Sequence, residues 1–391
     1  MNILYIWDAD YPWDIRVSKI CQTLHDNGHT VHIAARNLKK NTEYQLLEGL
    51  NIHRLKSIQN DKLNYILSFP VFFSPVWKKL LDKIIKTHHI DQIIVRDLPM
   101  AIAGIWAGKR NKIPVIFDMA EDYVSLVKDI WKTRKYHGLN LLVRNPYLAK
   151  LVELYTFKNI DHVIVVVSEA VDIVKNINKN ACVTIVSNTP ELNKINFIST
   201  NKVLVDRVKN KYSVIYTGGI QLGRGIQIVL DAIPDIIKII PEFQFVIVGD
   251  GYASEQIKQM IIDKGVEKYV FWVGWQNHDD MLCLIRESKV GIIPHFTSAH
   301  VNTTIPNKIF DYMACGLPVI SSDAIPMKRI LDEEKCGITF ESGNSKDLAN
   351  SIVTVYKSSY NFGVNGINAV KTKYNWEEDA KRLVSVVESF Q

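Results

Sequence analysis

The order of apolar and polar positions along the chain predicts buried strands that alternate with amphipathic helices. In the first half the apolar runs are NILYIW, TVHIAA, NIHRL, DQIIVR, PVIFDMA, HVIVVV and CVTIVSN. Helices are expected between them, including a helical region up to Lys86 and one long helix up to about Asn159. Near-continuous apolar strands separated by helices are typical of a doubly wound parallel sheet.

The alternation restarts after a polar stretch from Glu191 to Lys211, which we interpret as a linker. The second set of strands is SVIYTGG, FQFVIVGDG, VFWVGW, VGIIP, PVISS and GITF. We therefore predict an α/β protein with two doubly wound, Rossmann-like parallel-sheet domains that face each other across a cleft, a preferred place for a ligand. The predicted domains are residues 1–195 and 196–375, and the closing helix, residues 376–391, is expected to pack back toward the first domain.

The segment NTTIPNKIFDYMACGLPVISS, residues 302–322, is predicted to form a loop, a helix and a buried strand. Thr303 and Thr304 are typical N-cap residues, and Pro306 suits a first helical turn because it has no N–H to leave unbonded. Gly316 is a typical residue just past a helix end. The helix is therefore expected to begin near these threonines.

Helical periodicity gives this segment two faces. Ile309 and Met313 belong to an apolar face, whereas Lys308 and Asp311 share the opposite one. A helix start beside a lysine binds anions, and a carboxylate one turn later can accept hydrogen bonds from a sugar diol. The alternative is an ordinary surface helix.

Two glycine-rich turns follow predicted strands of the second half. In YTGGIQLGRGI, Gly218 and Gly219 allow a tight turn, and Arg224 is placed to hold a diphosphate by bidentate hydrogen bonds. The turn VGDG contains Gly249 and Asp250 and brings the backbone close to another group. A structural loop with a solvated arginine is the alternative for the first turn.

Charge is unevenly distributed along the 391 residues. The net charge is +6, but residues 1–195 carry +7 and the remainder −1. Much of the excess lies in PVWKKLLDKIIK and in residues 128–150, where basic and aromatic side chains alternate: Trp131, Lys132, Arg134, Lys135, Tyr136, Arg144 and Tyr147. This interleaving favours an anionic membrane surface or an acceptor carrying phosphate, with a solvated basic face as the alternative. We predict no nucleic-acid partner.

The remaining composition fits a soluble globular protein, with 47% hydrophobic and 23% charged residues. The five cysteines are isolated, which predicts neither a disulfide framework nor a zinc site. No basic stretch precedes an apolar run at the N-terminus, so no signal peptide is expected. The longest nearly uncharged run, Leu63 to Trp77, is too short to span a bilayer. We expect a cytoplasmic protein. Peripheral association with the inner face of the membrane is an open alternative to a freely diffusing one.

The order of these motifs resembles the retaining glycosyltransferases of the GT-B fold, the large family-four group. The second half carries the resemblance: a Gly-Gly turn with a basic residue before Gly, then VGDG, VGW, IIPH and PNKIFDYMACGLPVISSD. In the first half, IIVRDLP, IPVIFDMAEDY, DHVIVVVSEAV and IVSNTPE fall where that family has its acceptor-domain strands. The resemblance implies transfer of a sugar from a nucleotide-diphosphate sugar to a saccharide or lipid-linked saccharide, with retention, in cell-surface polysaccharide synthesis.

The resemblance also implies roles on the donor side. Arg224 stands at the basic residue that binds the donor diphosphate, and Asp311 at the second glutamate of a Glu-x7-Glu motif, which binds the ribose. Thr303 stands at the first glutamate of that motif, so Asn302, Thr303 or Thr304 would replace the acid. Gly219 stands where many members carry an arginine, and Lys308 is expected to restore that charge. Base recognition is expected around VGWQN, which contains Trp275.

The implied catalytic and acceptor-side residues come from both halves. We predict Glu121, Arg224 and Lys308 as catalytic candidates, with Glu121 and Asp122 the nearest polar substitutes for a histidine that members often carry near Ala120. The acceptor-side candidates lie at strand ends of the first half, each with a structural ion pair or strand-end cap as its alternative: Asp10, Arg16, Arg96, Asp97 and Glu121.

Three further expectations concern cofactors and rival functions. Only Asp8 and Asp10 have a metal-binding Asp-x-Asp spacing, so we predict a metal-independent reaction with no cofactor beyond the nucleotide-sugar substrate. One rival is a non-catalytic GT-B-fold scaffold in a polysaccharide assembly. The other is a nucleotide-sugar epimerase that needs no acceptor.

Overall fold

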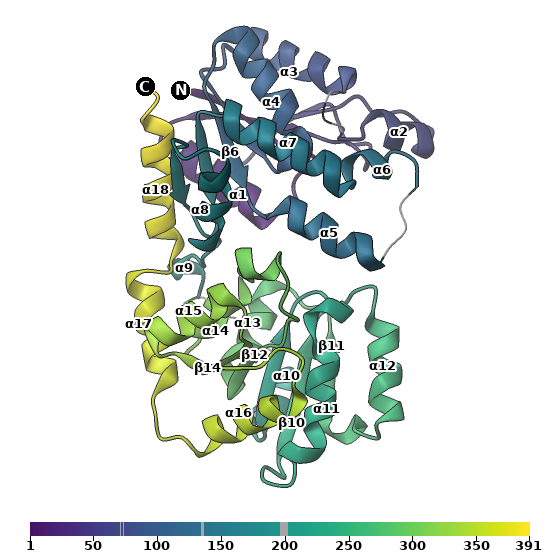
Figure 1. Ribbon diagram of the computed structural model, residues 1–391, viewed down its shortest axis with the longest axis vertical. Helices are drawn as coiled ribbons and strands as arrows, with labels where there is room; N and C mark the ends of the chain where they lie inside the picture. Colours follow the sequence, from purple (N-terminus) through teal and green to yellow (C-terminus); the bar gives the residue numbers. More distant parts are fainter. Residues whose placement is uncertain (71, 73, 134–136, 196–201) are drawn as a thin grey trace. The chain divides into compact units, whose positions relative to one another are not determined.

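The computed structural model describes residues 1–391 except 71, 73, 134–136 and 196–201 (Figure 1). The chain divides into two compact units. Unit 1 comprises Met1–Ser187 and Asp379–Gln391, and unit 2 comprises Asn188–Glu378. Each unit contains one mainly parallel sheet with connecting helices, which confirms the predicted α/β class with two parallel-sheet domains. The expected boundary at residues 195 and 196 adjoins a range outside the described residues.

Unit 1 has an eight-stranded sheet in the order β3-β4-β2-β1-β5-β6-β7-β8. The strands are β1 Asn2–Ile6, β2 Thr30–Ala35, β3 Tyr44–Leu47, β4 Leu50–Arg54, β5 Gln92–Arg96, β6 Val115–Met119, β7 His162–Val165 and β8 Val183–Ile185. All neighbours are parallel except β3, which pairs antiparallel with β4. The prediction did not include this edge strand.

The helices of unit 1 follow local sequence signals. In α3 (Pro75–His88), Ser74 caps the first turn, Pro75 occupies it, and Trp77, Leu81 and Ile84 form the buried face. The other helices are α1 Ile15–Asp26, α2 Asp61–Leu67, α4 Leu98–Asn111, α5 Tyr123–Thr133, α6 Asn140–Val143, α7 Pro146–Asn159 and α8 Glu169–Ile177. The single long helix expected up to Asn159 is therefore wrong, because the chain forms α5, α6 and α7 instead.

The last helix, α18 (Trp376–Glu388), contributes its larger part to unit 1 (Figure 1). The Asp379 carboxylate accepts a hydrogen bond from the Ser187 N–H at 3.0 Å. The Gln92 side chain donates to the Val387 carbonyl at 3.4 Å. The end of the chain thus packs beside β5 and β8.

Unit 2 has a six-stranded parallel sheet in the order β11-β10-β9-β12-β13-β14. Its strands are β9 Tyr212–Thr217, β10 Phe243–Val248, β11 Val270–Gly274, β12 Val290–Ile293, β13 Val319–Ser322 and β14 Gly337–Phe340. Its helices are α9 Leu192–Ile195, α10 Lys202–Lys209, η1 Leu222–Arg224, α11 Ile226–Ile236, α12 Ser254–Asp263, η2 Glu267–Tyr269, α13 His278–Glu287, η3 Val301–Thr303, α14 Lys308–Ala314, α15 Ile325–Glu334, α16 Ser345–Lys357 and α17 Phe362–Thr372. Helices α9 and α10 lie within the stretch from Glu191 to Lys211 that we interpret as a linker.

Strand order reverses once in each sheet, between β1 and β5 in unit 1 and between β9 and β12 in unit 2. At such a reversal the connections leave toward opposite faces of the sheet, so the carboxyl ends of the two strands diverge and leave room for a ligand. These two strand reversals are therefore the expected ligand sites of the two units.

Candidate functional site

The turn after β9 is built from close backbone contacts at the strand reversal of unit 2. Gly218 has φ +116° and donates its N–H to the Val248 carbonyl at 2.9 Å. An added Cβ on Gly249 would collide with the Gly218 carbonyl oxygen. The close backbone approach expected for VGDG is therefore confirmed, and the group approached is the neighbouring glycine turn. Any larger residue at Gly249 would separate the two turns.

Arg224 lies at the end of η1, beside the segment that follows β12. Its Nη1 atom is 3.3 Å from Nδ1 of His295, a residue only 2% exposed. Gly225 has φ +71°, and an added Cβ there would collide with the Pro294 carbonyl oxygen. The loops after β9 and β12 thus contact each other tightly, and this contact positions the arginine.

Lys308 is the first residue of α14, and its ammonium lies against the glycine turn. The Nζ atom is 3.7 Å from the centroid of the Tyr216 ring, and an added Cβ on Gly218 would lie 3.3 Å from Nζ. On the same helix, the Tyr312 hydroxyl accepts the Thr217 N–H at 3.0 Å and fastens α14 to the end of β9. The helix therefore presents its lysine at the strand reversal.

Arg224, Lys308 and His295 form a group that we call the cation cluster. Burial holds the pKa of Lys308 well below its ordinary value. The charge of Arg224 lowers this pKa further, whereas the charge of Asp311 raises it. Burial followed by the charges of Lys308 and Arg224 also holds the pKa of His295 well below its ordinary value. Each positive charge thus disfavours the others, and an anion bound here would relieve that repulsion.

Helix α14 begins later than predicted. Thr303 lies in η3, and Thr303 and Thr304 donate their hydroxyls to the His300 carbonyl at 3.1 and 3.0 Å instead of capping a helix. Pro306 precedes the helix, which begins at Lys308, so the helix start expected near these threonines is wrong. The expected helix stop at Gly316 is confirmed by its φ of +77° just past the helix.

Several other residues predicted on the donor side form hydrogen bonds with neighbouring turns and loops. Asn302 accepts the Ile325 N–H at 3.1 Å, which ties η3 to α15. Asp250 accepts the Gly251 N–H at 2.7 Å and the Ser254 hydroxyl, and these bonds lower the pKa of Asp250. Trp275 follows β11 at the outer edge of the sheet and is 75% exposed. Gly219 accepts the Tyr216 hydroxyl at 2.8 Å through its carbonyl.

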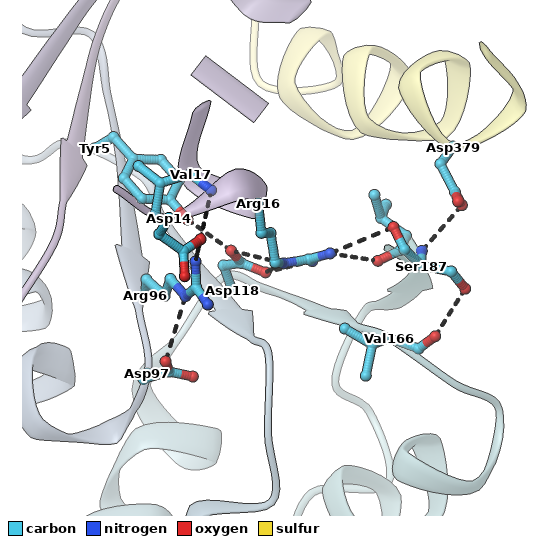
Figure 2. A network of polar contacts seen from close by, with 11 residues as sticks. Tyr5, Asp14, Arg16, Val17, Arg96, Asp97, Asp118, Val166, Ser187 and Asp379 are labelled. Atoms are coloured by element: carbon cyan, nitrogen blue, oxygen red, sulfur yellow. Dashed lines mark hydrogen bonds and ion pairs between the residues drawn. The ribbon is translucent and has the colours of Figure 1, made fainter. Parts of the chain in front are cut away.

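The strand reversal of unit 1 is acidic and internally paired (Figure 2). Arg96, at the end of β5, forms ion pairs with Asp14 and with Asp97, the latter at 3.3 Å. Its guanidinium lies 4.6 Å from the Trp7 ring centroid. Asp97 has φ +57°, which is strained for a residue with a side chain. Two acceptor-side candidates, Arg96 and Asp97, are thus brought together.

Two carboxyls at this edge, those of Asp97 and Asp8, bind protons more tightly than usual. Burial raises the pKa of Asp97 to about 8, with Arg96 opposing and Glu121 and Asp8 adding to the effect. Burial likewise raises the pKa of Asp8 to about 6. Asp97 and Asp8 are therefore carboxyls of this edge that favour the protonated form, whereas Glu121 is exposed.

Arg16 is a structural ion-pair partner (Figure 2). It is 2% exposed, its Nη2 lies 2.6 Å from the Asp118 carboxylate, and Nη1 donates to the Val186 carbonyl at 3.0 Å. Burial alone would raise the pKa of Asp118, but the Arg16 guanidinium lowers it. Of the two interpretations offered for Arg16, its geometry matches the ion pair. Asp10 accepts the Leu38 N–H at 2.7 Å, which matches a strand-end cap.

Sequence reasoning did not assign three residues of these sites: His295, Tyr216 and Asp14. His295 directly follows a buried strand, and a polar residue at such a place was the available signal. Tyr216 ends an apolar strand and gives no polar signal. Asp14 caps α1 through the Val17 N–H at 3.0 Å and was recognisable as a helix start.

The basic and aromatic segment of unit 1 is described in part. Arg134, Lys135 and Tyr136 lie outside the described residues, whereas Tyr147 is 81% exposed. Among the helices that the structure describes, none has the length and apolar character needed to cross a bilayer.

The fold and both halves of the sequence match glycosyltransferases. Residues 15–191 match the family described as "Glycosyltransferase Family 4", and residues 211–358 match "Glycosyl transferases group 1". Sucrose-phosphate synthase from Thermosynechococcus elongatus superimposes with a TM-score of 0.78 over 99% of this chain and 98% of that one, at 18% identity. Anabaena HepE in complex with UDP gives a TM-score of 0.74 over the full length of both chains, at 15% identity.

The fold is therefore that of the GT-B glycosyltransferases, and together these matches support membership of the GT-B glycosyltransferase group 1 family. Curated relatives align over shorter segments. An uncharacterized glycosyltransferase of Methanocaldococcus jannaschii is 20% identical over 62% of this chain and 62% of its own length. Phosphatidyl-myo-inositol mannosyltransferase of Mycobacterium leprae is 24% identical over 42% of this chain and 43% of its own length. The chain thus spans about half the length of these relatives.

Proposed function

We propose that this chain transfers a hexose from a nucleotide-diphosphate sugar to a saccharide or lipid-linked saccharide, with retention of configuration. Unit 2 holds the donor. The observation that carries the proposal is the cation cluster at the β9/β12 strand reversal, where Arg224 lies 3.3 Å from His295 and Lys308 lies against the glycine turn. Burial, and then the charges of Lys308 and Arg224, hold the pKa of His295 well below its ordinary value, so a bound negative charge would be stabilised there. A diphosphate supplies such a charge, whereas a neutral metabolite would leave the repulsion in place.

The cation cluster would also accelerate the chemistry. Breaking the bond between the sugar and the phosphate builds negative charge on the departing diphosphate. Arg224 and Lys308 are positioned before the reaction and would stabilise that charge. Asp311, one turn after Lys308, would accept hydrogen bonds from the donor ribose. A phosphate oxygen of the leaving group would take the acceptor proton, so the transfer would need no dedicated protein base.

The proposed donor rests on the similarity of this fold to that of HepE. HepE was crystallised with UDP and with UDP-glucose, and the fold match covers that whole chain. A uridine nucleotide is therefore the first donor to test. Guanosine, adenosine and thymidine nucleotides complete the panel, because the loop around Trp275 offers no base-specific side chain that we can assign.

The acceptor is proposed to be lipid-linked and used in cell-surface polysaccharide synthesis. Exposed apolar side chains line α6 and α7, among them Leu141, Leu142, Tyr147 and Leu151, beside the basic residues Arg144 and Lys150. Aromatic and basic side chains together favour an anionic membrane surface. A relative named phosphatidyl-myo-inositol mannosyltransferase agrees with this. Failure of the chain to float with anionic liposomes at low salt would remove the membrane part of the proposal.

The deciding experiment incubates the purified chain with a panel of nucleotide sugars and saccharide acceptors, and follows the product anomer by NMR. Acceptor-dependent transfer with retention supports the proposal. Nucleotide binding without turnover would favour a scaffold, and conversion of the donor without acceptor would favour an epimerase. Transfer should persist after dialysis against a chelator. If it stops and Mg²⁺ restores it, the metal-independent route is wrong.

A further inference from the structure

Three histidines from separate segments of unit 1 meet on one side of its sheet. His32 lies in β2, His53 in the neighbouring β4, and His88 ends α3. In the parallel pairing of β2 and β4, His32 is opposite Asn51 and His53 is opposite Ala34, which puts both imidazoles on the same face. The ring centroids of His32 and His88 are 4.3 Å apart, and those of His53 and His88 are 5.0 Å apart.

The ring nitrogens of this histidine cluster face one another at metal-binding spacing. One nitrogen from each ring lies within 4.8 Å of the other two, and Nδ1 of His32 is 3.1 Å from Nε2 of His53. In a tetrahedral zinc site, with Zn–N distances of about 2.0–2.1 Å, ligand nitrogens lie about 3.3 Å apart. The His32–His53 pair is already near that separation.

The surroundings of His32 and His53 favour the neutral imidazole, which is the form that binds metal. Burial, and then the neighbouring histidines, lower the pKa of His32 and of His53 to about 4. Tyr44, whose ring is 5.3 Å from that of His53, donates its hydroxyl to Asn51 at 2.9 Å and so points its polar atom elsewhere. Over the described part of the chain, the cluster contains only histidines. Three imidazoles without carboxylates suit zinc, copper, nickel or cobalt ions rather than Mg²⁺ or Ca²⁺.

We propose that His32, His53 and His88 bind one divalent late transition-metal ion, with Zn²⁺ as the probe and a fourth position left to water. The ion would tie the end of α3 to β2 and β4. His88 lies four residues before β5 begins, whereas Arg96 is the last residue of that strand and Asp97 follows it. The metal would therefore stabilise unit 1 from the amino end of β5 and take no part in sugar transfer.

The test uses the full-length chain after chelator treatment and dialysis, titrated with ZnCl₂ by calorimetry and followed by thermal unfolding. We expect one ion per chain and a higher melting temperature at saturation. His88→Gln should bind Zn²⁺ at least about tenfold more weakly. His89→Gln, which changes the adjacent exposed histidine, should bind as the wild type does. No saturable binding by the wild type, or equal affinities for all three proteins, would overturn the proposal.

A second readout needs no variant. Co²⁺ replaces Zn²⁺ in such sites and reports its geometry in the visible spectrum. The wild-type chain should give the strong absorption of four-coordinate Co²⁺, and Zn²⁺ should bleach it. The weak spectrum of six-coordinate Co²⁺ would contradict a three-histidine site. Transfer activity measured in parallel should be the same with and without Zn²⁺, which separates this proposal from the proposed function.

Discussion

The two strand reversals have the same topology and opposite charge arrangements. At β1/β5 in unit 1, arginines lie in ion pairs with carboxylates, Arg96 with Asp14 and Asp97. At β9/β12 in unit 2, Arg224 and Lys308 oppose each other's charge, and both oppose a proton on His295. A charge that is already balanced contributes to stability, whereas like charges held together favour a ligand of opposite sign. The comparison therefore supports our proposal that the donor diphosphate binds in unit 2, whereas the charges of unit 1 form a fixed framework.

The largest effect is expected from the buried pair of unit 1. Asp118→Ala leaves the Arg16 guanidinium without its partner in the interior. Breaking a buried ion pair on one side costs about 3–5 kcal/mol, and the free energy of unfolding should fall by that amount. Urea denaturation followed by circular dichroism measures it. Asp129→Ala, which removes an exposed pair with Lys132, should cost at most about 1 kcal/mol. Equal losses would contradict the buried role.

The next effect concerns catalysis in unit 2. Arg224→Ala removes a positioned cation that would stabilise the leaving diphosphate, so kcat should fall by about 10²–10³. Steady-state transfer assays with the best nucleotide sugar measure this. Arg286→Ala is the matched control, because that arginine is exposed on α13. If both variants keep wild-type kcat, the cation cluster does not act in the reaction.

A smaller effect is expected on donor affinity. Asp311→Ala removes the carboxylate assigned to the donor ribose, and binding should weaken by about 1–3 kcal/mol. Calorimetric titration of the nucleotide sugar gives the change in Kd. Asp332→Ala, at an exposed position of α15, should leave Kd unchanged. If Asp311→Ala bound the donor with the wild-type Kd, the assignment of Asp311 to the ribose would be wrong.

The smallest expected effect is a pH dependence of the free energy of unfolding that arises from unit 1. Because the folded-state pKa of Asp97, about 8, lies above the ordinary aspartate value, the folded state holds this proton more tightly. The contribution of this proton to the free energy of unfolding is fully present below about pH 4 and is lost as the pH rises to 8. The free energy of unfolding should change with pH by at most about 1.4 kcal/mol per pH unit in that range. Asp97→Asn should remove that slope.

Asp250→Asn is the control for this pH dependence. Its hydrogen bonds lower the pKa of Asp250, so the carboxylate stays charged between pH 5 and 8 and its replacement should not alter the slope in that range. Unfolding measured at intervals of pH compares the variants. A pH dependence of Asp97→Asn that equals the wild-type one would show that Asp97 is not the group responsible.

Much of the fold could be predicted because buried parallel strands are apolar on both faces. Strand β3 was missed because YQLL lies at the sheet edge and alternates between exposed and partly buried positions. The prediction of one long helix up to Asn159 was wrong because Asn145 caps a new helix through the N–H groups of Tyr147 and Leu148. That cap and Pro146 were readable in the sequence.

The site was predictable only where a motif is local. Arg224 and Lys308 were found because each lies in a recognisable segment, and the structure places both at the β9/β12 reversal. Arg16 and Asp118 are far apart in the sequence, so their pairing depends on the fold. The histidine cluster likewise depends on the register between β2 and β4 and on the end of α3, which no single segment reveals.

The central claim, that the cation cluster of unit 2 holds the donor diphosphate, is tested most directly by nucleotide binding. Calorimetry would compare wild type, Arg224→Ala and Asp97→Asn, using whichever of UDP, GDP, ADP and TDP the wild type binds most tightly. A lost hydrogen bond to a charged group is worth about 1.5–3 kcal/mol, so Arg224→Ala should bind at least about tenfold more weakly while Asp97→Asn binds as wild type does. Unchanged affinity in Arg224→Ala together with a loss in Asp97→Asn would contradict the account.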